Sequence, residues 1–190
     1  MIRIQLCDLA KEFELDSVLM YRPIAKGMFQ KTYDIIQCPK QGTMINCSFK
    51  NIEACDASFA DEFIINIQKH LLKFPNVIFY LSDCCETIIW DLKGALAVRN
   101  EKDNTKYNIL IFKDSRFEFL GKIEKNLLET FEFVQKNGSA TARDLVPEFG
   151  IEINSAGNRL KKLYDSNKLF RDEIKDETGR QHVYYIKEQY

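Results

Sequence analysis

The spacing of apolar residues divides the chain into two patterns, and the first extends to about residue 119. Short apolar runs there alternate with longer segments in which apolar residues recur every three or four positions. The runs predict strands over residues 2–6, 43–49, 77–81, 107–112 and 116–119. The longer segments predict helices over residues 22–36, 58–74 and 86–98. This alternation is typical of a mixed or parallel sheet with helices packed on it.

The second pattern begins near residue 120 and consists of helices followed by two strands. Apolar spacing predicts one helix over residues 123–135, a second ending at residue 149 and a third ending at residue 167. Gly138 and Gly150 are expected to stop the first two. Candidate N-caps are Ser139 or Thr141 for the second helix and Asn154 or Ser155 for the third. Strands follow over residues 168–175 and 181–187, joined by a turn that contains Gly179.

Three further local features stand out. The charged run over residues 99–106 predicts a solvated loop. Residues 9–20 fit neither a helix nor a strand clearly. Trp90, the only tryptophan, is expected to pack on its own helix.

Charge and hydropathy narrow the class of partner. The formal net charge of −1 lacks the positive balance of non-specific nucleic-acid binding, so any DNA contact must be local. The N-terminus alternates like a strand instead of forming a signal peptide, and no window reaches 18 apolar residues. We therefore expect a cytoplasmic protein without a membrane contact, in which the six cysteines stay reduced.

The residues that usually carry catalysis do not form a motif. There is no glycine-rich phosphate loop, no nucleophile elbow and no zinc-binding spacing, and His70 and His182 lie far apart. Cys84 and Cys85, an adjacent pair at a predicted helix start, are consistent with either simple packing or a redox sensor. We expect no catalytic residue, metal or cofactor. An enzyme with an unrecognised site stays open as an alternative.

One segment carries a family resemblance. Residues 51–62 read Asn-Ile-Glu-Ala-Cys-Asp-Ala-Ser-Phe-Ala-Asp-Glu. This resembles the phosphoacceptor segment of STAS domains, the anti-sigma-factor antagonist fold. It is most similar to a STAS-like group with a Phe-Ala-Asp-Glu motif, matched by residues 59–62, and with an arginine before an alanine-bearing helix, matched by Arg22 and Ala25.

The resemblance implies a role for two residues. Asp56 matches the family's aspartate, and Ser58 matches the serine that a histidine-kinase-like ATPase phosphorylates, whereas Ala57 and Phe59 replace a serine and a glycine. Read without the family, Ser58 fits either an N-cap or a phosphoacceptor at a helix start. Neighbouring helical residues diverge by about 100°, so Asp61 and Glu62 are expected to serve the helix start and not to act as paired carboxylates.

The C-terminal order of helices and strands resembles a winged-helix DNA-binding domain. In such domains the third helix presents polar side chains to bases and phosphates, and the hairpin adds further contacts. The DNA-contact candidates are Asn154, Ser155, Asn158, Arg159, Lys162, Lys175 and Arg180. Residues 155–187 hold eight Lys or Arg against five Asp or Glu, but residues 120–190 hold twelve of each. A protein-binding or structural role therefore stays open.

We thus predict an α/β STAS-like domain with a mixed sheet and packed helices over residues 1–118. A small α+β winged-helix domain follows over residues 119–190. The predicted function is transcriptional regulation, with double-stranded DNA as one partner and a histidine-kinase-like ATPase or another regulatory protein as a second. The alternative is a phosphorylatable protein-interaction switch that does not bind DNA. The oligomeric state is open, with a homodimer among the alternatives.

Overall fold

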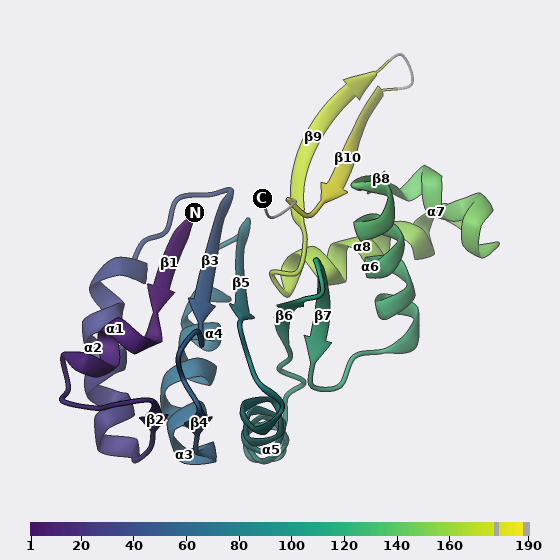
Figure 1. Ribbon diagram of the computed structural model, residues 1–190. Helices are drawn as coiled ribbons and strands as arrows, with labels where there is room; N and C mark the ends of the chain where they lie inside the picture. The colour runs from purple at the N-terminus through teal and green to yellow at the C-terminus, as the bar shows by residue number, and fades with distance from the viewer. Residues whose placement is uncertain (177–178, 188–190) are drawn as a thin grey trace.

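A five-stranded mixed sheet organises the chain. The computed structural model describes residues 1–176 and 179–187. The strand order is β1-β3-β5-β6-β7, with the first four parallel and β7 antiparallel to β6 (Figure 1). The strands are β1 (Ile2–Gln5), β3 (Thr43–Ser48), β5 (Val77–Ser82), β6 (Ile109–Lys113) and β7 (Arg116–Leu120). The predicted class, an α/β fold with a mixed sheet and packed helices, is confirmed.

Helices cover one face of this sheet. They are α1 (Leu6–Lys11), α2 (Arg22–Ile36), α5 (Glu86–Asp103) and a continuous helical segment made of α3 (Ala57–Phe59), η1 (Ala60–Ile65) and α4 (Asn66–Leu71). Strand order advances in one direction and parallel crossovers are right-handed, so the connecting helices fall on the same side. Alternate strand residues such as Ile45, Phe79 and Leu81 pack with Phe63 and Leu92 in one buried core.

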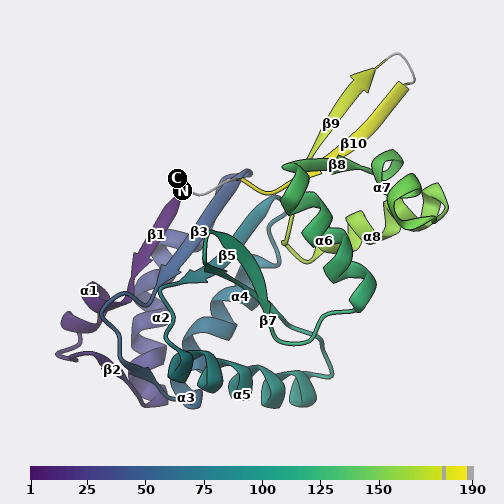
Figure 2. The ribbon, with the colours of Figure 1, turned by 45° about the vertical axis from the view of Figure 1, so that its right-hand side comes forward.

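The C-terminal elements cover the opposite face. They are α6 (Lys125–Asn137), β8 (Ser139–Thr141), α7 (Ala142–Phe149), α8 (Ile153–Asp165), β9 (Phe170–Asp176) and β10 (Gly179–Tyr185). The three strands form a second sheet of order β8-β10-β9. Its hairpin of β9 and β10 stands clear of the five-stranded sheet (Figure 2). We call residues 1–120 the sheet unit and residues 125–187 the C-terminal unit.

The two units share a hydrophobic core. Strand residues that alternate with those of the first core, among them Ile78, Tyr80 and Phe117, pack in one cluster with Phe131 and Leu160 of the C-terminal helices. Period-two alternation therefore buries both faces of the sheet, one under each helical layer. The C-terminal unit is consequently packed on the sheet unit.

Hydrogen bonds between side chains and backbone also join the units. Asn76 exchanges two bonds with the backbone of Arg171, at 3.0 and 2.9 Å. Buried Asn167 donates to the carbonyl of Leu71, the last residue of α4, and to that of Phe74 in the turn beyond it. Three more bonds of this kind join the units: Gln135 exchanges two with the backbone of Phe117, and Lys168 donates one to the carbonyl of Asn108. Each fixes the orientation of one unit on the other, because the geometry of such bonds is narrow.

Several local predictions are confirmed, since they depend only on nearby residues. Thr141 forms a capping box with Asp144, its backbone N–H donating to the Asp144 carboxylate at 2.7 Å. Gly138 and Gly150 end their helices with positive φ values of 77° and 62°. The tip of the predicted hairpin turn, residues 177–178, lies outside the described residues.

Other predictions were wrong. The charged run expected as a loop continues α5 to Asp103, because Arg99 pairs with Asp61 and Lys69 pairs with Asp103. Trp90 is 74% exposed, and the centre of its ring lies 5.9 Å from Nζ of Lys93 on the same helix. Residue 152, not Asn154 or Ser155, is the N-cap of α8, and it makes no side-chain cap bond. None of the described helices is both long and apolar enough to span a membrane.

Candidate functional site

The turn before α3 is organised by Asp56. This residue follows β4 (Ala54–Cys55), which pairs in parallel with β2 (Val18–Leu19). One carboxylate oxygen of Asp56 accepts from the backbone N–H of Phe59 at 2.6 Å and from the Ser58 hydroxyl at 2.8 Å. The other accepts from the backbone N–H of Tyr21 at 3.2 Å. Asp56 is therefore the N-cap, and the interpretation of Ser58 as the cap was wrong, because Ser58 already lies in the first helical turn.

Tyr21 holds an uncommon backbone conformation beside this cap. Its φ of 72° and ψ of 125° lie outside the regions that non-glycine residues usually adopt. The bond from its N–H to Asp56 fixes this geometry, and its carbonyl accepts from Ala25 at the start of α2. The Tyr21 side chain is 64% exposed. One carboxylate thus sets both the entry into α2 and the entry into α3.

An ion-pair network surrounds the next turn. Nη1 of Arg22 lies 2.9 Å from a carboxylate oxygen of Asp61 and 2.8 Å from one of Glu62. Nε of Arg99 lies 2.6 Å from the other Asp61 oxygen. Asp61 and Glu62 are adjacent in the sequence, and the single Arg22 side chain reaches both carboxylates. Sequence reasoning found Arg22 through the family resemblance and missed Arg99, which it placed in a loop.

These contacts keep both aspartates ionised. Burial raises the pKa of Asp56, but the hydrogen bonds from Phe59, Ser58 and Tyr21 outweigh it and place the pKa below its ordinary value. Burial acts on Asp61 in the same way, and the bonds and charges of Arg99 and Arg22 again lower its pKa overall. Both carboxylates are therefore ionised near neutral pH and act as hydrogen-bond acceptors.

The distance between the Ser58 hydroxyl and the Asp56 carboxylate suits a nucleophile and its general base, but Asp56 lacks the properties of such a base. A general base works best with a pKa near the operating pH. The pKa of Asp56 is lowered, and its two oxygens already accept the backbone N–H groups of Tyr21 and Phe59. The arrangement suits a helix cap and does not activate the Ser58 hydroxyl.

The DNA-contact candidates fall into two groups. Asn154, Ser155 and Asn158 are exposed on the first turns of α8, and Lys162 is exposed further along. Arg159 is half-buried, with its guanidinium 5.7 Å from the centre of the Phe149 ring. These five share one helix whose buried side is formed by Ala156, Leu160 and Leu163.

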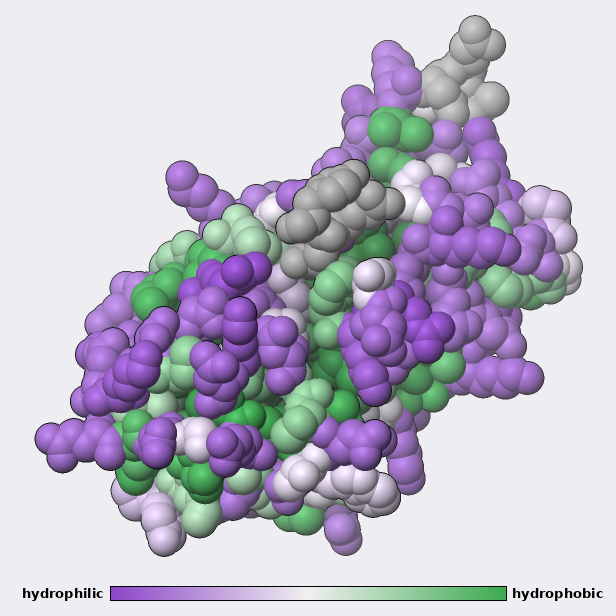
Figure 3. Space-filling model, viewed as in Figure 1, coloured by the Kyte–Doolittle hydropathy of each residue, from purple (hydrophilic) through white to green (hydrophobic). Residues whose placement is uncertain are grey.

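The second group lies on the hairpin. Lys175 and Arg180 are exposed cross-strand partners of β9 and β10. Acidic neighbours reduce the positive field of both groups, since Arg180 lies 3.4 Å from Glu173 and Lys162 lies 3.6 Å from Glu124. The surface over the C-terminal helices is mainly hydrophilic (Figure 3).

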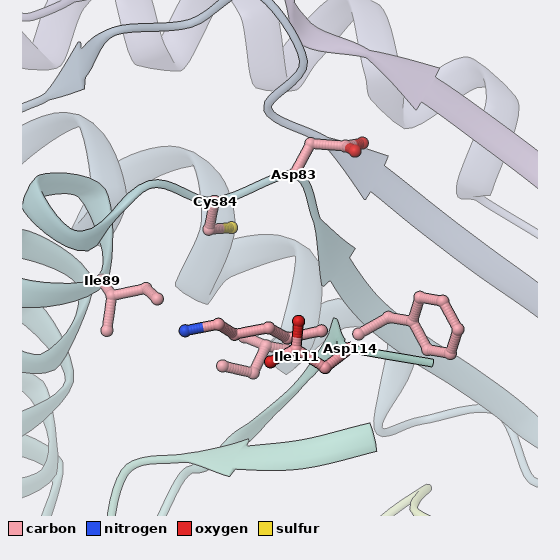
Figure 4. Close-up of a pocket in the computed structure, with 7 residues that line it drawn as sticks. Asp83, Cys84, Ile89, Ile111 and Asp114 are labelled. Carbon is pink, nitrogen blue, oxygen red and sulfur yellow. The ribbon is translucent and has the colours of Figure 1, made fainter. Parts of the chain in front are cut away.

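A small cavity of about 290 Å³ lies at the carboxyl ends of β5 and β6. Asp83 and Cys84 come from the loop after β5, and Asp114 follows β6 (Figure 4). The Asp83 carboxylate is occupied, because it accepts from the hydroxyls of Ser48 at 2.7 Å and Ser82 at 2.8 Å. Burial, and to a lesser extent Asp83, raises the pKa of Cys84 to about 12. A thiol of this kind is unreactive, which argues against a redox role for Cys84.

Comparison with known proteins adds no assignment. No protein-family model matches the chain, no curated protein is similar to it at a significant level, and no solved structure matches its fold. A functional assignment therefore depends on the geometry of the Asp56 turn and of the C-terminal unit.

Proposed function

We propose that this protein is a transcriptional regulator with two surfaces. The C-terminal unit acts as a winged helix that binds duplex DNA through α8, and the sheet unit acts as a STAS-like domain that receives a protein partner. The observation that carries the proposal is the exposed polar start of α8, formed by Asn154, Ser155 and Asn158, on a helix anchored by its opposite face. The exposed face of such a helix can enter the major groove while its buried face stays packed against the rest of the unit.

The arrangement of the C-terminal unit supports the winged-helix assignment. Its order is helix, strand, two helices and a hairpin, and β8 completes a three-stranded sheet by pairing with β10. The hairpin carries Lys175 and Arg180 at neighbouring positions and extends away from the sheet unit (Figure 2). A projecting hairpin with exposed basic side chains can follow the phosphate backbone beside a groove.

Charge limits the expected strength of this binding. The second half of the C-terminal unit has an excess of three basic residues over residues 155–187, while residues 120–190 are balanced. Affinity for DNA depends strongly on the number of phosphates that Lys and Arg neutralise. We therefore expect a modest affinity that needs base contacts from α8 to select a site.

The sheet unit supplies a distinct surface for a protein partner. Tyr21 is exposed next to the Asp56 cap, and Val18 of the neighbouring strand β2 is 39% exposed. Exposed apolar side chains close to a polar turn are typical of protein-contact sites. Because the units share a core and several hydrogen bonds, a partner at this turn is rigidly connected to the DNA-binding unit.

Fluorescence anisotropy with a pool of mixed-sequence DNA duplexes tests the proposal. The full chain is compared with Asn154→Ala combined with Asn158→Ala, and with a control that carries Lys125→Ala at the exposed start of α6. The α8 variant should lose site selection from the pool by at least about tenfold, because each base contact contributes 1–3 kcal/mol, while the control keeps it. Equal selection by all three proteins would contradict the proposal.

A second candidate function is a phosphorylation switch at Ser58. The observation in its favour is the 2.8 Å bond between the Ser58 hydroxyl and Asp56. A phosphate on this oxygen removes the donated proton and places about −1.5 to −2 charges beside a carboxylate. The cap that orients both Tyr21 and Phe59 would then loosen.

The two candidate functions predict different results for Ser58→Asp. The switch predicts changed affinity for a histidine-kinase-like ATPase partner, measured by pull-down with the purified proteins, and no DNA binding by either form. Selective DNA binding by the unmodified chain favours the regulator. Unchanged partner affinity in Ser58→Asp, with Ser58→Ala as the matched control, would contradict the switch.

A further inference from the structure

A second cavity lies between the two units. Its volume is about 320 Å³, at the lower end of the range of small-molecule sites. Asn108 and Phe119 line it from the sheet unit, and Leu127, Leu163 and Lys168 line it from the C-terminal unit. A ligand here would contact both units at once, so its binding would depend on how they are packed.

Basic side chains dominate the charge of this cavity. Its lining residues include four lysines and one glutamate, namely Lys106, Lys122, Lys162, Lys168 and Glu124. Lys106 and Lys162 both lie close to Glu124, at 3.5 and 3.6 Å. The single carboxylate is thus already shared, and the site keeps an excess of positive charge next to the apolar side chains of Phe119, Leu127 and Leu163.

Lys168 is the unusual member of the set, because its side chain is buried. Only 1% of the residue is exposed, and Nζ donates to the carbonyl oxygen of Asn108 at 2.7 Å. Asn108 also lines the cavity, so the amine lies at the cavity wall. Among the described residues no carboxylate forms an ion pair with Lys168. A buried ammonium group without a counter-ion is costly, and an anion in the cavity would offset that cost.

We propose that this cavity binds a small monocarboxylate with an apolar body, whose carboxylate pairs with Lys168 and whose hydrocarbon part contacts Phe119, Leu127 and Leu163. The apolar side chains favour a hydrocarbon, and the unpaired charge favours an anion. A neutral lipid leaves the ammonium group unpaired, and an inorganic anion leaves the apolar walls unused. A medium-chain fatty acid satisfies both requirements.

The site also suggests how such a ligand regulates the protein, and this step rests on the proposed function. Lys162 belongs both to the cavity lining and to the exposed residues of α8 that we assign to DNA contact. A bound carboxylate attracts Lys162 toward the cavity and away from a phosphate. The ligand is therefore expected to weaken DNA binding.

Isothermal titration calorimetry on the full chain tests the site, with octanoate and 1-octanol as probes at about pH 6.5, just below the Lys168 pKa of about 7, where most of the amine is protonated. The two probes share their hydrocarbon chain and differ in charge. Octanoate should bind at least about tenfold more tightly than octanol, because only its carboxylate forms a charged hydrogen bond with the buried amine. Equal affinities, or no heat from octanoate, would overturn the proposal.

Two substitutions sharpen this result. Lys168→Met keeps the length of the side chain and removes the amine, so octanoate affinity should fall at least tenfold while octanol affinity is kept. Lys161→Met, on α8 and outside the cavity lining, should leave both affinities unchanged. An unchanged octanoate affinity in Lys168→Met would refute the assignment. If this variant does not fold, Lys122→Met serves instead, with an expected loss of twofold to fivefold.

The titration and the DNA measurement can fail independently. Octanoate binding that depends on Lys168 establishes the cavity even if the chain binds no DNA. If DNA does bind, octanoate should lower its affinity for the full chain and leave that of Lys168→Met unaffected. An octanoate effect on DNA that persists in Lys168→Met would show that the ligand acts elsewhere.

Discussion

The Asp56 carboxylate accepts the Ser58 hydroxyl at 2.8 Å while the same oxygen caps the helix at Phe59, so the aspartate is the structural centre of this turn. Asp56→Ala removes the cap and the bond to Tyr21, and we expect it to lower the free energy of unfolding by about 1–2 kcal/mol. Ser58→Ala removes one partly exposed bond and should cost less than about 0.5 kcal/mol. Urea unfolding compares the two, and equal losses would refute this hierarchy.

Asp61 is expected to matter more for stability than Glu62. Its carboxylate pairs with Arg99, whose side chain is only 12% exposed, whereas the ion-pair partner of Glu62 is Arg22, which is 53% exposed. Asp61→Asn should cost about 1–3 kcal/mol, because it weakens a largely buried charged contact. Glu62→Gln should cost less than about 1 kcal/mol. Urea unfolding of both variants measures the difference, and a larger loss in Glu62→Gln contradicts the network as described.

The same pair predicts a response to acid. Bonds from Arg99 and Arg22 outweigh burial and lower the pKa of Asp61 in the folded chain. A lowered pKa contributes stability above the unfolded value of about 3.9, and this contribution is lost as the pH falls through the folded pKa. Wild type should therefore lose more stability than Asp61→Asn below about pH 4. Parallel acid-unfolding curves would show that Asp61 is not involved.

Lys168 predicts a pH dependence of the same sign in the neutral to alkaline range. Burial lowers its pKa from 10.5 to about 7 in the folded chain. Between these values the unfolded chain binds more protons, so the free energy of unfolding should rise with pH, by up to about 1.4 kcal/mol per unit. Denaturant unfolding from pH 7 to about pH 9 measures this slope. The range stops at the ordinary thiol pKa of 9.0, so that ionisation of the cysteines contributes little to it. Lys168→Met should flatten it, and an equal slope in both proteins would contradict the buried amine.

Gln135 protects the edge of the main sheet. Its side-chain oxygen accepts from the N–H of Phe117 at 2.7 Å, and its amide donates to the Phe117 carbonyl at 3.3 Å. β7 is the terminal strand, and open strand edges recruit other chains. Gln135→Ala should cost about 1–2 kcal/mol and promote aggregation on heating, whereas Lys136→Ala on the same helix should do neither. Light scattering during thermal unfolding distinguishes the two variants.

The sequence predicted those parts of the fold that depend on local patterns. Alternating apolar residues gave the strands of the main sheet, and Gly138 and Gly150 gave two helix ends. The length of α5 was underestimated, because the pairing of Arg99 with Asp61 joins residues 38 positions apart and leaves no local signal. The cap was assigned to Ser58 instead of Asp56, since both residue types cap helices and only the backbone course decides between them.

The packing of the two units against each other could not be predicted from local sequence patterns either. The sequence divides cleanly near residue 120, yet Tyr80 and Phe117 of the sheet pack with Phe131 of α6 in one core. A residue such as Tyr80 in a continuous apolar strand does not indicate which helix will cover it. For the same reason the cavity beside Lys168, which needs both units, had no sequence signal.

The dependence of DNA affinity on salt tests the central claim most directly. If Arg159 and Lys162 contact phosphates, the double variant with alanine at both positions should bind DNA more weakly and reduce the magnitude of the slope of log K against log salt by about 2. Lys125→Ala should keep the wild-type slope. A wild-type slope in the double variant, or no binding by the wild-type chain at low salt, would contradict DNA recognition by α8.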